Sequence, residues 1–239
     1  MSHRVCSSHS SHTAPLGYIK VSQCLWKRFL SPAAAKVAWV LPSPEPSRSR
    51  VTMSSPLRNP AKAGLLAGEH GTNMDVLPFD TTSKESIDAC LETVMQKTGG
   101  KLYILVNNAG FGTTMPLLHA SIEAAKAIYD VNVWGTLSLA QALSPLLLKS
   151  KGVIMNICSV VGAANVAWQG IYNSSKAAET MISESLRIEL EPLGIRVMTV
   201  MLGQVSTQMY ANTPAFHLPE GSPYEKVAGT ITSSSGGGT

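Results

Sequence analysis

The stretch Leu102-Tyr103-Ile104-Leu105-Val106-Asn107-Asn108-Ala109-Gly110 joins a continuous apolar run to a short polar turn. Such a run is typical of a strand that is buried on both faces of a sheet. On either side of it, strand-like runs alternate with helical patterns, and this alternation predicts right-handed crossovers around a parallel sheet. The fold class that the sequence predicts is therefore α/β, with a doubly wound parallel sheet.

The other elements follow from the same kinds of pattern. We expect further strands at 74–79, 153–158 and 195–201, and helices at 85–97, 122–148 and 172–190. Ser83 is the expected N-cap of the first helix, and Gly99 ends it. The long second helix is expected to bend near Gly135 or Pro145.

The composition limits the classes of function that need to be considered. The chain has 239 residues, of which 44% are hydrophobic, and a formal net charge of +4. This length suits one sizeable α/β domain, and the absence of basic stripes argues against nucleic acid as a partner. The four cysteines lack metal-ligand spacing, so we expect reduced thiols and no metal site. No uninterrupted apolar run reaches the ~18 residues of a membrane span, which leaves peripheral membrane contact as an open alternative.

Both ends of the chain differ from the middle. Residues 1–55 are rich in Ser, His and Pro, and Glu45 is their single acidic residue. We expect an atypical, disordered extension here, and an organellar transit peptide is the alternative. The regular domain is expected over 56–232, followed by a flexible Ser- and Gly-rich tail at 233–239.

Ser159, Tyr172 and Lys176 form the most informative group of polar residues. Tyr172 and Lys176 are four positions apart, so both head groups can reach one small site from the same helix face. A free phenol has a pKa of about 10, and a neighbouring ammonium lowers it by favouring the phenolate. A Ser hydroxyl at the same point can hydrogen-bond a substrate oxygen. Together these groups can move a proton to or from a carbonyl/alcohol pair.

Other motifs follow the predicted strands in order, and their side chains should converge, because ligands of open α/β sheets bind outside the carboxyl ends of the strands. The motifs are Asn107-Asn108-Ala109-Gly110, Asn132-Val133-Trp134-Gly135, Ser159, Tyr172 to Lys176 and Gly203-Gln204-Val205-Ser206-Thr207. Taken together over about 56–230, these motifs resemble the short-chain dehydrogenase/reductase family, which implies a Rossmann-like fold. Within that family, the segments 115–118, 130–135 and 168–176 resemble fungal NADPH-dependent 1-acyldihydroxyacetone-phosphate reductases.

The resemblance assigns a catalytic role to four residues. Tyr172 would be the general acid in reduction and the general base in oxidation, and Lys176 would lower its pKa and bind the nicotinamide ribose. Ser159 would orient the substrate carbonyl. Asn132 would hold a water molecule in a proton relay behind Lys176.

The resemblance also implies a set of residues that bind NADP(H), with NAD(H) less favoured because an Arg in the position of Arg58 commonly pairs with the 2′-phosphate. The sequence leaves a plainer interpretation open for three of them. Asn107 could satisfy backbone groups at a strand end, Asp80 could cap the following helix, and Arg58 could be a surface residue. The implied cofactor-binding residues are Arg58, Asp80, Asn107, Ala109, Gly110, Asn132, Tyr172, Lys176, Val205 and Thr207.

One part of the family pattern is missing from the chain. The family opens with a strand, a T-G-x-x-x-G-x-G turn and a helix, which hold the cofactor pyrophosphate. Nothing similar precedes Arg58. We therefore expect a fold that is incomplete at its N-terminal strand and at its C-terminal end.

Two functional hypotheses follow. The first is an NADP(H)-dependent oxidoreductase that interconverts a ketone and a secondary alcohol on a lipid-type substrate such as acyldihydroxyacetone phosphate. The second is a truncated, inactive family member whose role is at most dimerisation. The expected partners are a small-molecule substrate and a second copy of the chain. The expected location is the cytoplasm, with contact at the endoplasmic reticulum or lipid-droplet surface as an extension of the lipid hypothesis.

Overall fold

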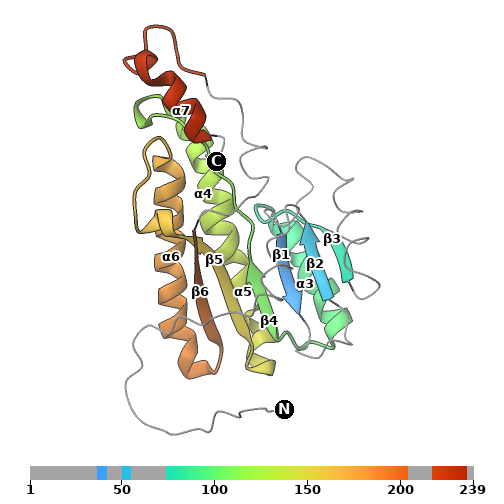
Figure 1. The fold of residues 1–239 in the computed structure, drawn as a ribbon. Coiled ribbons are helices and arrows are strands. Elements are labelled where there is room, and N and C mark those ends of the chain that lie inside the picture. The colour runs from blue at the N-terminus through green and yellow to red at the C-terminus, as the bar shows by residue number, and fades with distance from the viewer. Residues whose placement is uncertain (1–36, 42–49, 55–73, 204–216, 236–239) are drawn as a thin grey trace, which may run out of the picture.

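The computed structural model describes residues 37–41, 50–54, 74–203 and 217–235 of the chain. Six strands form one sheet in the order β3-β2-β1-β4-β5-β6 (Figure 1). This order and the alternation of strands with helices confirm the predicted Rossmann-type α/β fold. The strands are β1 (Val37–Leu41), β2 (Arg50–Ser54), β3 (Met74–Pro78), β4 (Ile104–Asn107), β5 (Val153–Ser159) and β6 (Arg196–Leu202).

The direction of β1 departs from the parallel pattern. It pairs antiparallel with both β2 and β4, whereas β2 with β3, β4 with β5 and β5 with β6 are parallel. In its register with β4, Ala38 lies opposite Asn107 and Leu41 lies opposite Ile104. The chain therefore leaves β1 at the edge of the sheet where β4 begins, which is the edge away from the carboxyl ends of β4, β5 and β6.

These strands correct one prediction. Residues 1–55 are not a disordered extension throughout, because 37–41 and 50–54 are strands of the sheet, and β1 pairs with β4. The physical reason is that a buried β4 would otherwise leave a row of unpaired backbone groups along one edge. A short apolar segment of either direction can pair with that row, and the composition around Val37–Leu41 concealed this segment.

Three helices pack side by side along the sheet: α3 (Lys84–Thr98), α5 (Thr136–Ser150) and α6 (Gly170–Leu190) (Figure 1). The predicted caps of α3 are confirmed, since Ser83 accepts a hydrogen bond from the Ser86 N–H and Gly99 adopts φ 62°. The main hydrophobic core lies between α3, α5 and strands β4 to β6. Its fully buried members include Val94, Leu102, Leu105, Leu147, Ile154 and Ile195.

The predicted long helix at 122–148 is divided into three parts. α4 (Ile122–Tyr129) leads into a π-helical turn at Asp130–Gly135, and α5 continues to Ser150 with Pro145 inside it. Gly135 is required here because a Cβ at this position would lie 2.8 Å from the Thr81 side chain. The irregular turn therefore coincides with a close approach to the loop before α3.

Two smaller points concern the C-terminal region and the membrane. α7 (Ala228–Ser235) continues into residues 233–235, which corrects the prediction that the flexible tail begins at 233. The helical stretch Ile122–Ser150 is long and apolar enough to cross a membrane by length and composition alone. Half of its apolar window is buried in the fold, as in the core helix of a soluble protein, so the membrane evidence is weak.

Replacing Val40 with proline tests whether β1 is a strand. Both sides of β1 are paired, so the loss of one backbone N–H removes a ladder hydrogen bond and should lower the free energy of unfolding by about 1–3 kcal/mol. Urea denaturation measures the change, and Val40→Thr, which keeps the N–H, is the matched control. A Val40→Pro variant as stable as this control would return the segment to an unpaired extension.

Candidate active site

The structure brings together the four residues predicted to be catalytic. Asn132 lies in the π-helical turn, Ser159 is the last residue of β5, and Tyr172 and Lys176 lie in the first two turns of α6. All four are buried. They meet at the carboxyl ends of β4 and β5, where the topology predicts the ligand crevice.

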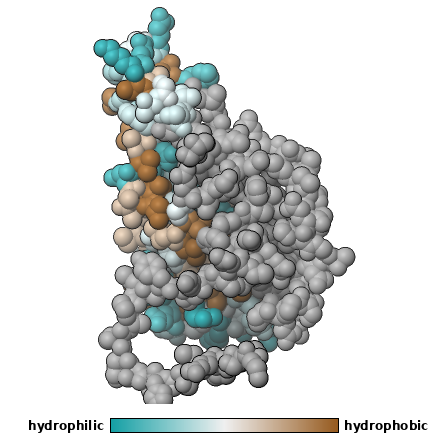
Figure 2. Space-filling model, viewed as in Figure 1, coloured by the Kyte–Doolittle hydropathy of each residue, from teal (hydrophilic) through white to brown (hydrophobic). Residues whose placement is uncertain are grey.

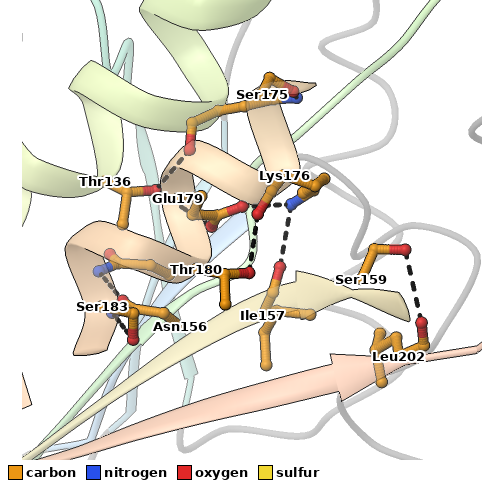
Figure 3. Close-up of polar contacts among 12 residues, drawn as sticks. Thr136, Asn156, Ile157, Ser159, Ser175, Lys176, Glu179, Thr180, Ser183 and Leu202 are labelled. Atoms are coloured by element: carbon orange, nitrogen blue, oxygen red, sulfur yellow. Dashed lines mark hydrogen bonds and ion pairs between the residues drawn. The ribbon is translucent and has the colours of Figure 1, made fainter. Parts of the chain in front are cut away.

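The Lys176 head group is fixed by two contacts (Figure 3). Its Nζ donates to the Ile157 carbonyl oxygen at 2.9 Å and to Glu179 Oε2 at 2.7 Å. Burial alone would lower the Lys176 pKa, but the Glu179 carboxylate and, less strongly, Tyr172 outweigh it, so the pKa is raised above its ordinary value. Lys176 is therefore a buried ammonium ion.

Asn132 joins the Asn-Asn-Ala-Gly loop to α6. Its Oδ1 accepts from the Phe111 N–H at 3.0 Å, and its Nδ2 donates to the Phe111 carbonyl at 2.9 Å and to Ser175 Oγ at 3.0 Å. The side chain is fully buried. A π-helical turn shifts the register of a helix, and such turns are frequent at functional sites.

Two glycines leave room around the head groups. A Cβ on Gly110 would lie 3.3 Å from both Lys176 Nζ and Asn132 Oδ1. A Cβ on Gly112 would lie 2.7 Å from a Tyr172 ring carbon, so the ring packs directly on this backbone. Any other residue at Gly112 would displace the Tyr172 ring.

Ser159 is held at the end of β5 by its neighbours. Its Oγ donates to the Leu202 carbonyl at 3.4 Å and accepts from the Val161 N–H at 3.4 Å (Figure 3). Both contacts are long, so the hydroxyl can exchange them for a stronger bond to a substrate oxygen. Burial raises the pKa of the adjacent Cys158 thiol to about 12, which makes this cysteine a poor nucleophile at neutral pH.

Sequence reasoning missed Glu179. It lies three residues after Lys176 and seven after Tyr172, which places all three on one helix face. Its carboxylate is buried beside Lys176, and Thr136 Oγ1 lies 3.5 Å from its second oxygen. The signal was available as an acidic residue in the same helical period as the Tyr–Lys pair.

The structure gives the Asn107 side chain a partner on the neighbouring strand rather than a backbone group. Its Nδ2 donates to Asn156 Oδ1 at 2.8 Å, and Asn156 Nδ2 in turn donates to Ser183 Oγ at 2.9 Å. This bond joins β4 to β5 below the site. The Asn107 Oδ1 has no hydrogen-bond partner among the described residues, and its role toward a cofactor stays a prediction.

The remaining predicted cofactor residues differ in what the structure shows. Asp80 is not the cap of α3, because Ser83 is; instead its Oδ1 accepts from the Thr82 N–H and hydroxyl at 2.9 and 2.7 Å. Ala109 and Gly110 are buried just after β4. Arg58, Val205 and Thr207 lie outside the described residues.

Comparison with known proteins now decides the family. A family model described as short chain dehydrogenase matches residues 50–217. This chain belongs to the short-chain dehydrogenase family. A short-chain dehydrogenase of Talaromyces islandicus, cctT, is 48% identical over 179 residues, covering 73% of this chain and 62% of that protein.

Two further relatives bear on the family's chemistry and fold. The NADPH-dependent 1-acyldihydroxyacetone phosphate reductase of Schizosaccharomyces pombe is 34% identical over 177 residues, covering 71% of this chain and 56% of that protein. The crystal structure of a short-chain dehydrogenase from Streptomyces avermitilis aligns with TM-score 0.65 at 25% identity, covering 77% of this chain and 66% of that one. The chain thus spans less than two thirds of the length of these relatives.

Short-chain dehydrogenases use a nicotinamide cofactor. The described residues of this chain differ in how well they suit its nicotinamide side and its pyrophosphate side. On the nicotinamide side, Gly110 lies close to Lys176 Nζ and Asn132 Oδ1, since a Cβ there would come within 3.3 Å of both, and Lys176 is the residue that would hold the ribose. The pyrophosphate side is different, since β1 ends with Leu41 opposite Ile104, at the edge of the sheet away from the site. Among the described residues, His, Cys, Asp and Glu form no group of three that could hold a metal ion.

Replacing Asn132 with alanine tests how the site is assembled. The change removes the hydrogen bonds that Asn132 makes with the Phe111 N–H, the Phe111 carbonyl and the Ser175 hydroxyl. We expect the free energy of unfolding to fall by about 1–3 kcal/mol, measured by urea denaturation, whereas Asn165→Ala on the exposed loop before α6 should have little effect. Equal stabilities of the two variants would show that Asn132 does not tie the loop to α6.

Proposed function

We propose that this protein is an oxidoreductase that interconverts a ketone and a secondary alcohol with NADP(H). The observation that carries the proposal is the buried, charged Lys176, which lies beside Asn132 and on the same helix face as Tyr172. The Glu179 carboxylate pairs with this ammonium and offsets the cost of burying it. The charge is thereby kept at the carboxyl edge of the sheet, next to the phenol whose ionised form it would stabilise.

Each side chain has a defined task in this proposal. Tyr172 gives its hydroxyl proton to the carbonyl oxygen in reduction and takes it back in oxidation, while the Lys176 charge stabilises the phenolate. Ser159 donates a hydrogen bond to the same substrate oxygen. The nicotinamide ring supplies the hydride when it is bound. Asn132 fixes the loop that borders the site.

The substrate and cofactor preference rest on weaker support. We propose a lipid-type ketone such as acyldihydroxyacetone phosphate, in line with the name of the S. pombe relative, which is also NADPH-dependent. Leu117, Leu118 and Val166 are exposed apolar residues on the loops after β4 and before α6, and they suit contact with an acyl chain. Arg58 supports NADP over NAD. We place the protein in the cytoplasm, with contact at the endoplasmic reticulum or lipid-droplet surface, where an acylated substrate would partition.

Replacing Tyr172 with phenylalanine tests the proposed proton transfer. The variant keeps the ring that packs on Gly112 and loses only the hydroxyl. We expect ketone reduction, followed by NADPH absorbance, to fall by at least about 10²-fold, with NADPH affinity from fluorescence titration nearly unchanged. A variant that retains turnover would refute the role of Tyr172.

A second candidate function is favoured by the direction of β1. Hydrogen bonds to charged groups contribute ~1.5–3 kcal/mol each, so losing a pyrophosphate turn would weaken cofactor binding by orders of magnitude. In this case the chain is a catalytically inactive family member whose remaining function is assembly. The same titration separates the two candidates: micromolar NADPH affinity excludes the inactive form, and a folded protein that does not bind NADPH at millimolar concentration supports it.

The outer face of α6 supports the proposal of a homodimer. Met181 and Ile188 are 69% and 64% exposed, and Trp134 in the neighbouring π-helical turn is 51% exposed. Figure 2 shows hydrophobic residues gathered along the side of the molecule where α6 lies in Figure 1. Exposed apolar residues on one helix face mark a site of protein contact, and a second copy of the chain is the occupant that we propose, because enzymes of this family act mostly as symmetric oligomers.

Replacing Met181 with glutamate tests this interface. A charge at the centre of an apolar helix contact should convert a dimer to a monomer, which size-exclusion chromatography with light scattering measures directly. Met95→Glu, on the exposed side of α3 (46% exposed), is the matched control and should remain dimeric. A wild-type monomer, or a dimer that survives Met181→Glu, would contradict the proposal.

A further inference from the structure

We propose that Glu179 is a positioning residue for Lys176, and that its buried carboxylate keeps the Lys176 head group in place and in its charged form. The inference deepens the proposed function, and its meaning for catalysis rests on that function. The contact itself exists whether or not the chain turns over a substrate.

The geometry fixes the carboxylate from two helices (Figure 3). Glu179 Oε2 lies 2.7 Å from Lys176 Nζ, and the two side chains are 1% and 6% exposed. The other oxygen faces Thr136 Oγ1 of α5 at 3.5 Å, and the same hydroxyl lies 3.2 Å from the Asn132 carbonyl. Glu179 therefore connects the ammonium to the start of α5, directly after the π-helical turn that carries Asn132.

The two contacts of Lys176 also determine what the head group can still do. An ammonium has three N–H donors, and in the described part of the chain Glu179 and the Ile157 carbonyl occupy two of them. On its other side Nζ faces Gly110, where the lack of a side chain keeps the backbone from crowding the head group, since a Cβ there would lie 3.3 Å from Nζ. A third donor is thus left for the site, while the other two prevent the long side chain from turning away.

The titratable groups that face Lys176 determine whether its head group stays charged. On α6 the titratable groups that face it are Tyr172 and Glu179, and on β5 it faces the Cys158 thiol, whose pKa of about 12 keeps it neutral. The π-helical turn and α5 contribute only the uncharged Asn132 and Thr136. Burial raises the pKa of the Glu179 carboxyl, and the charge and hydrogen bond of Lys176 oppose this rise. Among the described residues, Glu179 is the acidic group paired with this ammonium.

Removing the Glu179 charge should lower the pKa of Lys176. Burial favours the neutral amine, so without the carboxylate the pKa of Lys176 falls. Losing a negative charge from the cluster also lowers the pKa of Tyr172, as long as Lys176 is charged. Both changes shift the active protonation state for reduction, a neutral phenol beside an ammonium, to lower pH.

The first experiment measures Lys176 directly and needs no activity. Protein labelled with ¹³C-lysine is titrated by NMR, and the Lys176 Cε signal is assigned by its loss in Lys176→Met. In Glu179→Gln we expect the titration midpoint of this signal to fall by at least one pH unit, a tenfold change in the proton affinity. Glu189→Gln, which removes an exposed carboxylate from the same helix, should leave the midpoint unchanged. An unchanged midpoint in Glu179→Gln overturns the proposal.

The second experiment uses turnover. If the wild type reduces a ketone, the alkaline limb of its kcat/KM profile should move to lower pH in Glu179→Gln and stay in place in Glu189→Gln. A uniform loss of kcat/KM at every pH would mean that Glu179 is merely structural, which overturns the proposal. A wild type without turnover refutes the proposed function alone, since the NMR titration still decides the role of Glu179.

A third measurement covers the case in which Glu179→Gln does not fold well. An uncompensated buried ammonium is strongly destabilising, whereas an uncharged pair of similar volume is tolerated. The double variant Lys176→Met/Glu179→Leu should therefore be more resistant to urea than Glu179→Gln. The loss of stability in the double variant is also compared with the losses in Lys176→Met and Glu179→Leu alone. If it equals their sum, the two residues are not coupled, and the proposal is overturned.

Discussion

The packing of α6 on the sheet depends on buried hydrogen bonds as well as on apolar contact from Leu186 and Leu190. Most of the fully buried side chains of α6 are polar, and they are Asn173, Ser175, Lys176, Glu179 and Ser183, beside the ring of Tyr172. Buried polar groups destabilise a fold unless each finds a partner. The partners come from three other elements, since Ile157 lies on β5, Asn132 on the π-helical turn and Thr199 on β6. Strands, turn and helix are consequently held in a single arrangement, and the site is a product of that arrangement.

This polar inner face has a counterpart on the outside of the same helix. A surface helix ordinarily turns its apolar stripe to the core, but α6 exposes Met181 and Ile188. The core between α3, α5 and the sheet is filled by other residues, so these side chains are available for contact with another molecule. One face of α6 therefore holds the polar site residues, and the other exposes apolar side chains.

The reversed β1 shows how a sheet can be completed while part of a binding site is lost. The backbone edge of β4 requires a partner strand, and hydrogen bonding permits either direction. Cofactor binding is more demanding, because the turn after the strand must emerge at the same edge as Asn107 and Ser159. In this chain Ala38, at the start of β1, is the residue opposite Asn107. The sheet is thereby closed at β4, yet the C-terminal end of β1, at Leu41, lies at the edge away from Asn107 and Ser159.

The sequence by itself determined the features that depend on neighbouring residues. The apolar runs of β4 and β5, the Ser83 and Gly99 caps of α3 and the Tyr172–Lys176 spacing are local patterns, and each gave the correct element or face. The tertiary structure alone decided the direction of β1, the partners of Asn107 and the pairing of Lys176 with Glu179. These depend on which distant backbone edges and buried charges remain unpaired once the chain has collapsed. A strand of five residues carries no signal for its direction, and a glutamate acquires its partner only when burial removes water as the competitor.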